Sequence, residues 1–195
     1  MRQESTASAT SGHRAQKAAQ LTRAGVLLAV GLAIAFTAPL HEQLGFDLWA
    51  LITALVLIGA ATLVEYFAMR GTAESWWIAA RATVALAAAG SLIAVSESAT
   101  LALVLALWAA LTALITLMRL LRGVQSTRVA VPSLLLSIAL AVTALVFRDD
   151  PVAVIGFFGA YAIIRGVFLG ITAFDPRPAG VASGDDAAAA DTDQL

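Results

Sequence analysis

The sequence predicts an all-α polytopic membrane protein, a bundle of six transmembrane helices arranged as three helical hairpins that repeat one another. Three observations predict this fold. The chain has six long apolar runs that are almost free of charge, basic residues collect at alternate ends of these runs, and the runs open and close with similar residues. Of the 195 residues, 60% are hydrophobic and 13% are charged. A soluble domain has about 45–50% apolar and about 25% charged residues.

The six runs cover residues 24–40, 48–69, 76–96, 99–118, 129–147 and 151–174. A helix needs about 17–25 apolar residues to cross the hydrocarbon core of a bilayer, and each run has such a length. We therefore expect one membrane domain over residues 21–175, with hairpins at 23–71, 76–123 and 128–175. The flanking segments 1–20 and 176–195 are too polar and too rich in small residues to bury a core, so we expect two disordered cytoplasmic tails, the second one acidic.

Basic residues predict the orientation of the helices. With a cytoplasmic N-terminus, those on the inner side are Arg2, Arg14, Lys17, Arg23, Arg70, Arg81, Arg119, Arg122, Arg128 and Arg177. Arg148 alone faces outward, so the positive-inside rule predicts that both termini are cytoplasmic. The alternative is a cleaved signal peptide, but Pro39 would block cleavage after Ala38 and the hairpin repeat needs this helix.

The starts and ends of the hairpins indicate internal repetition. The odd-numbered runs open with RAGV at 23–26, RATV at 81–84 and RVAV at 128–131, and two even-numbered runs close with Arg-Gly at 70–71 and 122–123. Three copies argue against the two-fold inverted repeat of many secondary transporters. The alternative is that any six-span protein carries basic residues at its cytoplasmic ends.

Two segments carry a resemblance to a known family. The last run reads GAYAIIRGVFLGITAF over residues 159–174, and the fourth ends with LITLMRLLRG over 114–123. Together with the short hairpins, these segments resemble the HdeD family, and the resemblance covers about residues 20–175. It implies a small six-helix protein of the bacterial inner (cytoplasmic) membrane, linked to acid stress, and carries over no catalytic or binding residues. The acidic tail after Asp175 departs from the family's pattern.

Two charged residues lie deep within the predicted helices. Glu65 is six residues before Gly71, and Arg165 is ten residues before Asp175. Because an unpaired charge in the membrane interior costs at least about 2.5–3.5 kcal/mol, we expect Glu65 and Arg165 to contact each other or to share a polar partner. Three interpretations stay open: a polar centre for protons or solutes, a structural ion pair between two helices, and two side chains that extend separately toward the interface.

Small residues mark one face of the last helix. Gly159, Ala162, Gly166 and Gly170 follow one another at helical spacing, and the last two form a GxxxG pair. Small residues let helices approach closely in lipid, so this face predicts a packing surface. It serves either packing within one bundle or association of two copies.

The predicted outer turns contain one histidine and five acids, namely His41, Glu42, Asp47, Glu97, Asp149 and Asp150. Carboxylates titrate near pH ~4 and histidine near ~6.5, so these turns are candidates for acid sensing. Any solvated loop would show the same composition.

Enzyme chemistry is not expected. The sequence has no GxSxG, Walker loop or HExxH motif, no cysteine, and one histidine besides His41, namely His13, so no His/Cys metal site and no cofactor site are predicted. The basic residues are spread over helix ends, which does not favour nucleic-acid binding.

The expected partner is the lipid bilayer. The leading function is an HdeD-like role in acid or envelope stress. The alternatives are a small proton or solute transporter centred on Glu65 and Arg165, and a scaffold for an unknown membrane protein.

Overall fold

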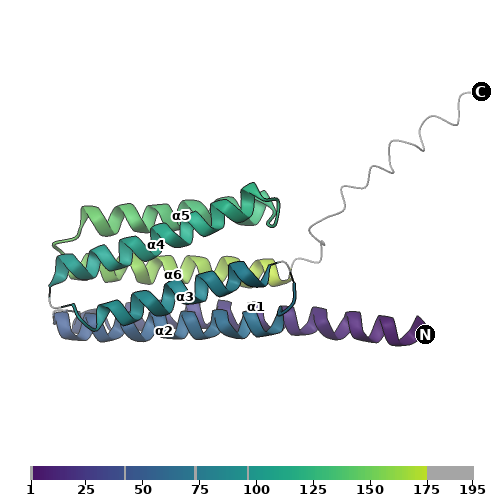
Figure 1. The fold of residues 1–195 in the computed structure, drawn as a ribbon. Coiled ribbons are helices and arrows are strands. Elements are labelled where there is room, and N and C mark those ends of the chain that lie inside the picture. Colours follow the sequence, from purple (N-terminus) through teal and green to yellow (C-terminus); the bar gives the residue numbers. More distant parts are fainter. Residues whose placement is uncertain (1, 42, 73, 96, 175–195) are drawn as a thin grey trace, which may run out of the picture.

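The computed structural model describes residues 2–41, 43–72, 74–95 and 97–174 (Figure 1). Over these ranges the regular structure is helical, which confirms the predicted all-α class. The elements are α1 (Arg2–Phe36), the 3-10 helix η1 (Ala38–Leu40), α2 (Leu44–Ala68), α3 (Ser75–Leu92), α4 (Ser98–Leu121), α5 (Thr127–Val146) and α6 (Pro151–Phe174).

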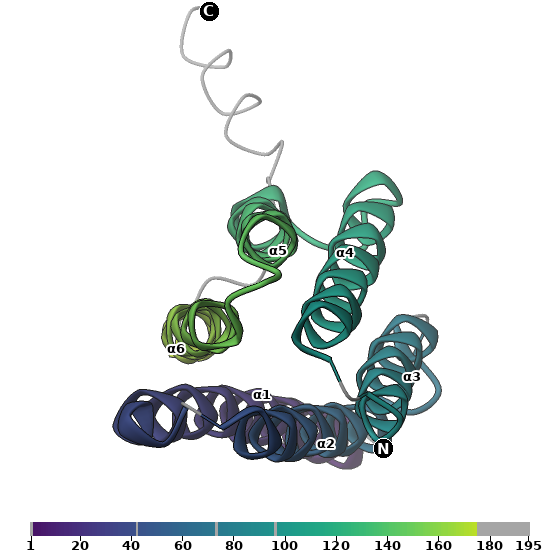
Figure 2. The same cartoon turned by 90° about the vertical axis from the view of Figure 1, so that its left-hand side faces the viewer.

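The helices run antiparallel in chain order and close into a ring. The turns α1–α2, α3–α4 and α5–α6 gather at one end of the bundle, and Figure 2 views the ring from that end. Each helix packs on its neighbours in sequence, and α6 closes the ring on α1. Packing is more extensive for the pairs α2–α3, α4–α5 and α1–α6 than within the hairpins α1–α2, α3–α4 and α5–α6.

Five of the described helices are long and apolar enough to cross a membrane. They are residues Gln16–Phe36 of α1, and all of α2, α4, α5 and α6. The remaining run, predicted as a span over 76–96, forms only the 18-residue helix α3. At 1.5 Å per residue α3 is roughly 27 Å long, just under the ~30 Å hydrocarbon core. It also carries Arg81 and several alanines and serines, which lower its hydropathy.

The first helix begins earlier than predicted. Residues 1–20 were expected to form a disordered tail, but α1 is helical from Arg2 and extends beyond the other helices (Figure 1). Ala19 is buried, and the Lys17 ammonium lies 4.6 Å from the ring centre of Phe174, so the bundle already includes this turn of α1. Residues 14–20, RAQKAAQ, all have high helix propensity, which favours continuation of α1 through this segment. The tail predicted over 176–195 lies outside the described residues.

The even-numbered helices bury the same register of positions. Counting back from Glu65 in α2, from Arg119 in α4 and from Arg165 in α6, the residues three, seven, ten and eleven positions earlier are buried in every case. This is the stripe of a helix with one face toward a core. Each stripe leads to a buried charged residue, Glu65, Arg119 or Arg165. These three residues lie in the half of the bundle that contains the N-terminus of α1.

The odd-numbered helices show a related register. Counting forward from Arg23 in α1 and from Arg81 in α3, the residues one, four, seven, eight and eleven positions later are buried in both. In α5 the corresponding buried positions are Ala130, Ser133, Ser137 and Leu140. Each of these positions is one residue later than the same count forward from Arg128 would give. Arg128 itself is exposed.

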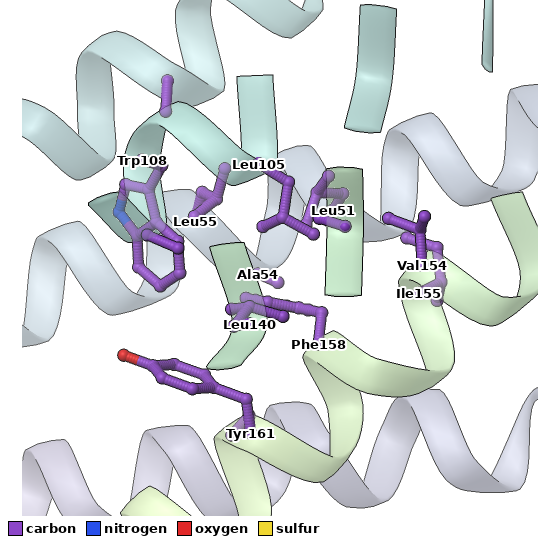
Figure 3. Packing of buried hydrophobic residues seen from close by; sticks show 14 of the residues in the cluster. Leu51, Ala54, Leu55, Leu105, Trp108, Leu140, Val154, Ile155, Phe158 and Tyr161 are labelled. Carbon is purple, nitrogen blue, oxygen red and sulfur yellow. The ribbon is translucent and has the colours of Figure 1, made fainter. Parts of the chain in front are cut away.

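Between the buried charges and the end that carries the three hairpin turns, the core is a cluster of apolar residues. Figure 3 shows Trp108 of α4 above Tyr161 and Phe158 of α6, with leucines of α2 and α4 beside them. The Trp108 ring lies 5.8 Å from each of the rings of Phe158 and Tyr161, in edge-to-face geometry. Tyr161 turns its hydroxyl away from this core, toward the buried charges.

Gly123 follows the C-cap of α4 with a φ of 67°, and Gly71 adopts a φ of 90° in the turn that follows α2. Residues with a Cβ rarely adopt such a φ, so the two Arg-Gly pairs that indicated repetition lie where the chain turns after α2 and α4.

Candidate functional site

A buried ion pair joins the two helices of the first hairpin. Arg23 of α1 donates from Nη1 to Oε2 of Glu65 in α2 at 2.9 Å, and the two residues are only 5% and 8% exposed. Arg23 lies at the start of the apolar part of α1, and the antiparallel hairpin brings it level with Glu65. The pair neutralises the single buried carboxylate in this half of the described bundle.

Arg165 of α6 has neutral partners. Its Nη1 donates to the hydroxyl of Tyr161 at 2.5 Å and to Oγ of Ser137 at 3.1 Å. Ser137 lies near the middle of α5 and donates in turn to the carbonyl of Ser133. Arg165 is 4% exposed, so its charge is held inside the bundle by two hydroxyl dipoles.

The expected contact between Glu65 and Arg165 is therefore wrong. Each has a different hydrogen-bond partner among the described residues, Arg23 for Glu65 and the two hydroxyls for Arg165. Arg23 directly precedes the first apolar run, a position typical of a flanking residue at the cytoplasmic interface. Its burial makes it the nearer counter-ion.

A small cavity lies between the two groups. Its lining consists of Arg23, Leu27, Ile58, Thr62, Arg81, Ala85, Trp108, Thr112, Tyr161 and Arg165, from α1, α2, α3, α4 and α6. It holds about 20 Å³ for the centre of a water molecule, room for about one or two waters. Three arginines thus line one cavity, and the nearby carboxylate of Glu65 is already bonded to one of them. The centre carries an excess of positive charge.

One buried donor of a residue that lines the cavity lacks an acceptor within the described part of the chain. The buried Nε of Arg23 has no hydrogen-bond acceptor among the described residues. The hydroxyls of Thr62 and Thr116, in contrast, donate to the backbone carbonyls of Ile58 and Thr112. An unpaired buried donor costs about 1–3 kcal/mol, so an acceptor within hydrogen-bond distance of this Nε would be stabilised.

A second ion pair lies closer to the α2–α3 and α4–α5 turns. Arg119 of α4 donates to Oε2 of Glu74 at 3.2 Å, and Arg119 is buried. Sequence reasoning placed Arg119 outside the spans with the other basic residues. The signal that could have found it is the common spacing Thr62–Glu65, Thr116–Arg119 and Ala162–Arg165 along the buried stripes.

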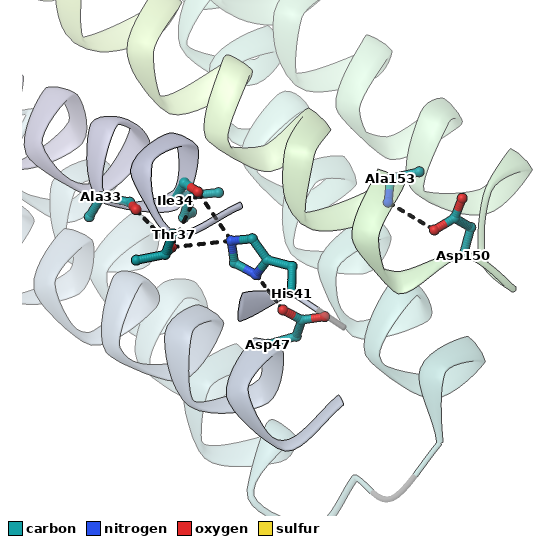
Figure 4. A network of polar contacts seen from close by, with 7 residues as sticks. All are labelled: Ala33, Ile34, Thr37, His41, Asp47, Asp150 and Ala153. Carbon is teal, nitrogen blue, oxygen red and sulfur yellow. Dashed lines mark hydrogen bonds and ion pairs between the residues drawn. The ribbon is translucent and has the colours of Figure 1, made fainter. Parts of the chain in front are cut away.

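His41 and Asp47 form a buried pair at the opposite end, in the α1–α2 turn (Figure 4). Nδ1 of His41 lies 2.5 Å from Oδ1 of Asp47, and Nε2 lies 3.1 Å from the carbonyl of Ile34. Because a carbonyl only accepts, Nε2 carries a proton that it donates to Ile34. The hydrogen bond to Asp47 then needs a second proton, on the imidazole or on the carboxylate. His41 and Asp47 were expected in solvated turns, and their burial corrects that prediction.

The other predicted outer acids are not part of this pair. Glu97, Asp149 and Asp150 are exposed. Asp150 accepts a hydrogen bond from the backbone nitrogen of Ala153 and so caps α6. Glu42 lies outside the described residues.

The small face of α6 packs on α1. A Cβ added at Gly166 would lie 2.8 Å from the backbone nitrogen of Leu28, and one at Gly159 would lie 2.9 Å from Cγ2 of Ile34. Ala162 is fully buried. At Gly170 an added Cβ would meet nothing within 4 Å, so Gly170 does not pack closely within this bundle, and association of two copies at Gly170 stays a prediction. In the turn of α6 that contains Gly170, the helix no longer lies close to α1.

Within the described residues, no group of three His, Cys, Asp or Glu side chains could hold a metal ion. Comparison of the chain with protein-family models, curated proteins and solved structures found no match. The similarity to the HdeD family thus stays a hypothesis that rests on the two quoted segments and the hairpin pattern.

Proposed function

We propose that this chain is a six-span membrane protein that passes small anions through its arginine-lined centre. The observation that carries the proposal is the convergence of Arg23, Arg81 and Arg165 on one cavity with a single neighbouring carboxylate, Glu65. Buried charges in a membrane bundle usually face a pathway or a partner. A positive centre in a low dielectric attracts anions and repels cations.

Each arginine contributes differently to this centre. Arg23 is held by Glu65 and offers its free Nε. Arg165 is held by two hydroxyls and keeps its full charge. Arg81 is half-buried and lines the same cavity from α3. An anion entering past Arg81 exchanges hydration water for guanidinium donors, and the cavity, which has room for about one or two waters, must widen by side-chain movement to let it through.

The proposed topology places both termini in the cytoplasm, with α3 as the sixth span. The antiparallel course of α3 between α2 and α4 supports it, as does the beginning of α1 at the same end of the bundle as the end of α6. Arg70, Arg122 and Arg128 lie in or beside the turns at that end, where the positive-inside rule puts the cytoplasm. The matching buried registers and the alternating strength of helix packing support three repeated hairpins.

The test is anion flux in proteoliposomes loaded with a halide-sensitive dye. We expect chloride entry in wild-type protein, at least about tenfold slower entry in Arg165→Gln, and unchanged entry in the control Arg148→Gln, since Arg148 is exposed in the α5–α6 turn. Absence of flux, together with co-purification of a stoichiometric partner, would favour a scaffold instead.

A role in acid or envelope stress is the second candidate. The observation that favours it is the His41–Asp47 pair, since addition or loss of one proton changes the charge of a buried group in the first hairpin turn. Growth and cytoplasmic pH of a deletion strain under acid challenge test this role. Complementation by the wild-type chain but not by Asp47→Asn would link it to the pair.

A further inference from the structure

A second, larger cavity lies between α5 and α6. It is a groove of about 320 Å³, at the lower end of the ~300–1,000 Å³ typical of small-molecule sites. On α5 its lining lies between Pro132 and Ala139, and on α6 it consists of Ile164, Arg165 and Phe168. The α5–α6 pair is also the least extensively packed pair of neighbouring helices in the ring.

The groove opens sideways, away from the bundle axis. Two of its lining residues, Leu135 and Ile164, are 60% and 55% exposed. For a bundle that spans a membrane, this side faces the hydrocarbon tails of lipids. The lining is apolar apart from Ser133 and Arg165, so the groove is complementary to an alkyl chain.

Arg165 lines both this groove and the central cavity. Its hydrogen-bond acceptors among the described residues are two uncharged hydroxyls, so it lacks a carboxylate partner there. A guanidinium group recognises a carboxylate through two parallel hydrogen bonds, and this geometry is strongest where water is excluded. The groove thus combines an apolar lining with one buried arginine.

We propose that this groove binds a single-chain carboxylate, such as a medium-chain fatty acid, with its head at Arg165 and its alkyl chain between α5 and α6. The inference rests on the anion role proposed above and names the class of anion. Arg165 lies nine residues before Phe174, at a depth of roughly 14 Å from that end of α6. A phospholipid would have to draw its phosphate and glycerol to this depth, whereas a fatty acid has no polar part beyond its carboxylate.

Binding of radiolabelled octanoate to the protein in phosphatidylcholine nanodiscs tests the proposal, with empty nanodiscs as the correction for partition into lipid. We expect saturable binding that unlabelled octanoate displaces at least about tenfold better than octanol, which has the same chain without the charge. Equal displacement by octanol would overturn the role of Arg165.

Two variants of α5 separate the groove from general effects on folding. Ala139→Phe fills the groove and leaves Arg165 in place, so octanoate binding should fall at least about tenfold. Val142→Phe is the matched control, because Val142 is exposed one turn further along α5 and does not line the groove. Wild-type binding in Ala139→Phe would overturn the proposal.

Two further measurements distinguish octanoate binding in the groove from phospholipid binding and from anion passage. Loss of octanoate binding when phosphatidylglycerol replaces phosphatidylcholine would overturn the proposal in favour of an anionic phospholipid. Chloride flux in the same preparation reports on the proposed anion passage alone. Octanoate binding without chloride flux would refute that passage while supporting the groove, and flux without octanoate binding would refute the groove.

Discussion

At the scale of single residues, the partner of Glu65 decides how the buried charges are stabilised. Removing one member of a buried ion pair leaves the other as an uncompensated charge, while removing both avoids this cost. The variants Arg23→Leu and Glu65→Leu should each lower stability in detergent, and the double variant should recover part of the loss. We expect a coupling energy of about 1–3 kcal/mol from the double-mutant cycle.

The matched control is the same cycle on Glu65 and Arg165. Since these residues have different hydrogen-bond partners, their coupling should be the smaller of the two and near ~0.5 kcal/mol. A larger coupling for Glu65 with Arg165 than for Glu65 with Arg23 would show that the structure assigns the wrong partner.

The His41–Asp47 pair gives a second residue-scale prediction. Asp47→Asn removes the carboxylate that faces Nδ1 and should lower Tm by at least about 2–4 °C for a chain of this size, as expected for about 1 kcal/mol. Asp149→Asn is the control, since Asp149 is exposed and its nearest basic group, Arg148, lies 3.7 Å away on the surface. Equal effects of the two substitutions in a thermal unfolding assay would mean that the buried pair does not stabilise the turn.

At the scale of helices, the contact between α1 and α6 closes the ring. Gly166→Leu would place a side chain against the backbone of α1 at Leu28, so this variant should fold in low yield or with a lowered Tm. Gly170→Leu lies one turn away on the same face and meets open space, so its Tm should stay within about 2 °C of wild type. Equal behaviour of the two variants by size-exclusion chromatography and thermal unfolding would contradict this packing.

Apolar run length was enough to predict the helices, because a bilayer-spanning helix needs a long apolar stretch with few charges. The same criterion failed to anticipate how short α3 is, since helix ends depend on local turns such as the one after Leu92. It also treated Arg23 and Arg119 as flanking residues. An arginine near a helix end looks the same in sequence whether it meets solvent or a carboxylate on another helix, and only packing separates the two.

Only part of the predicted small face of α6 packs on α1, because packing of the neighbouring helix decides where such a face is covered. Spacing along one helix identifies a stripe, and Gly159, Ala162 and Gly166 do lie against α1. Where a stripe stops being covered depends on the position and direction of the neighbouring helix. Gly170 lies past that limit, which its own sequence context does not reveal.

At the scale of the whole molecule, the proposed topology makes α3 the decisive span. Reporter fusions after Gly71 and Gly123 should report the cytoplasm, and those after Glu97 and Asp149 the outside, because α3 must cross the membrane for these positions to alternate. The same compartment for fusions after Gly71 and Glu97 would leave five spans and place the termini on opposite sides.

The central claim is that the buried arginines make the interior selective for anions. The most direct measurement is the reversal potential of purified protein in a planar bilayer or liposome membrane under a potassium chloride gradient. Three arginines around one cavity and one paired carboxylate predict a reversal potential close to the equilibrium potential of chloride. A value close to the equilibrium potential of potassium, or no chloride conductance or flux at all, would contradict the account.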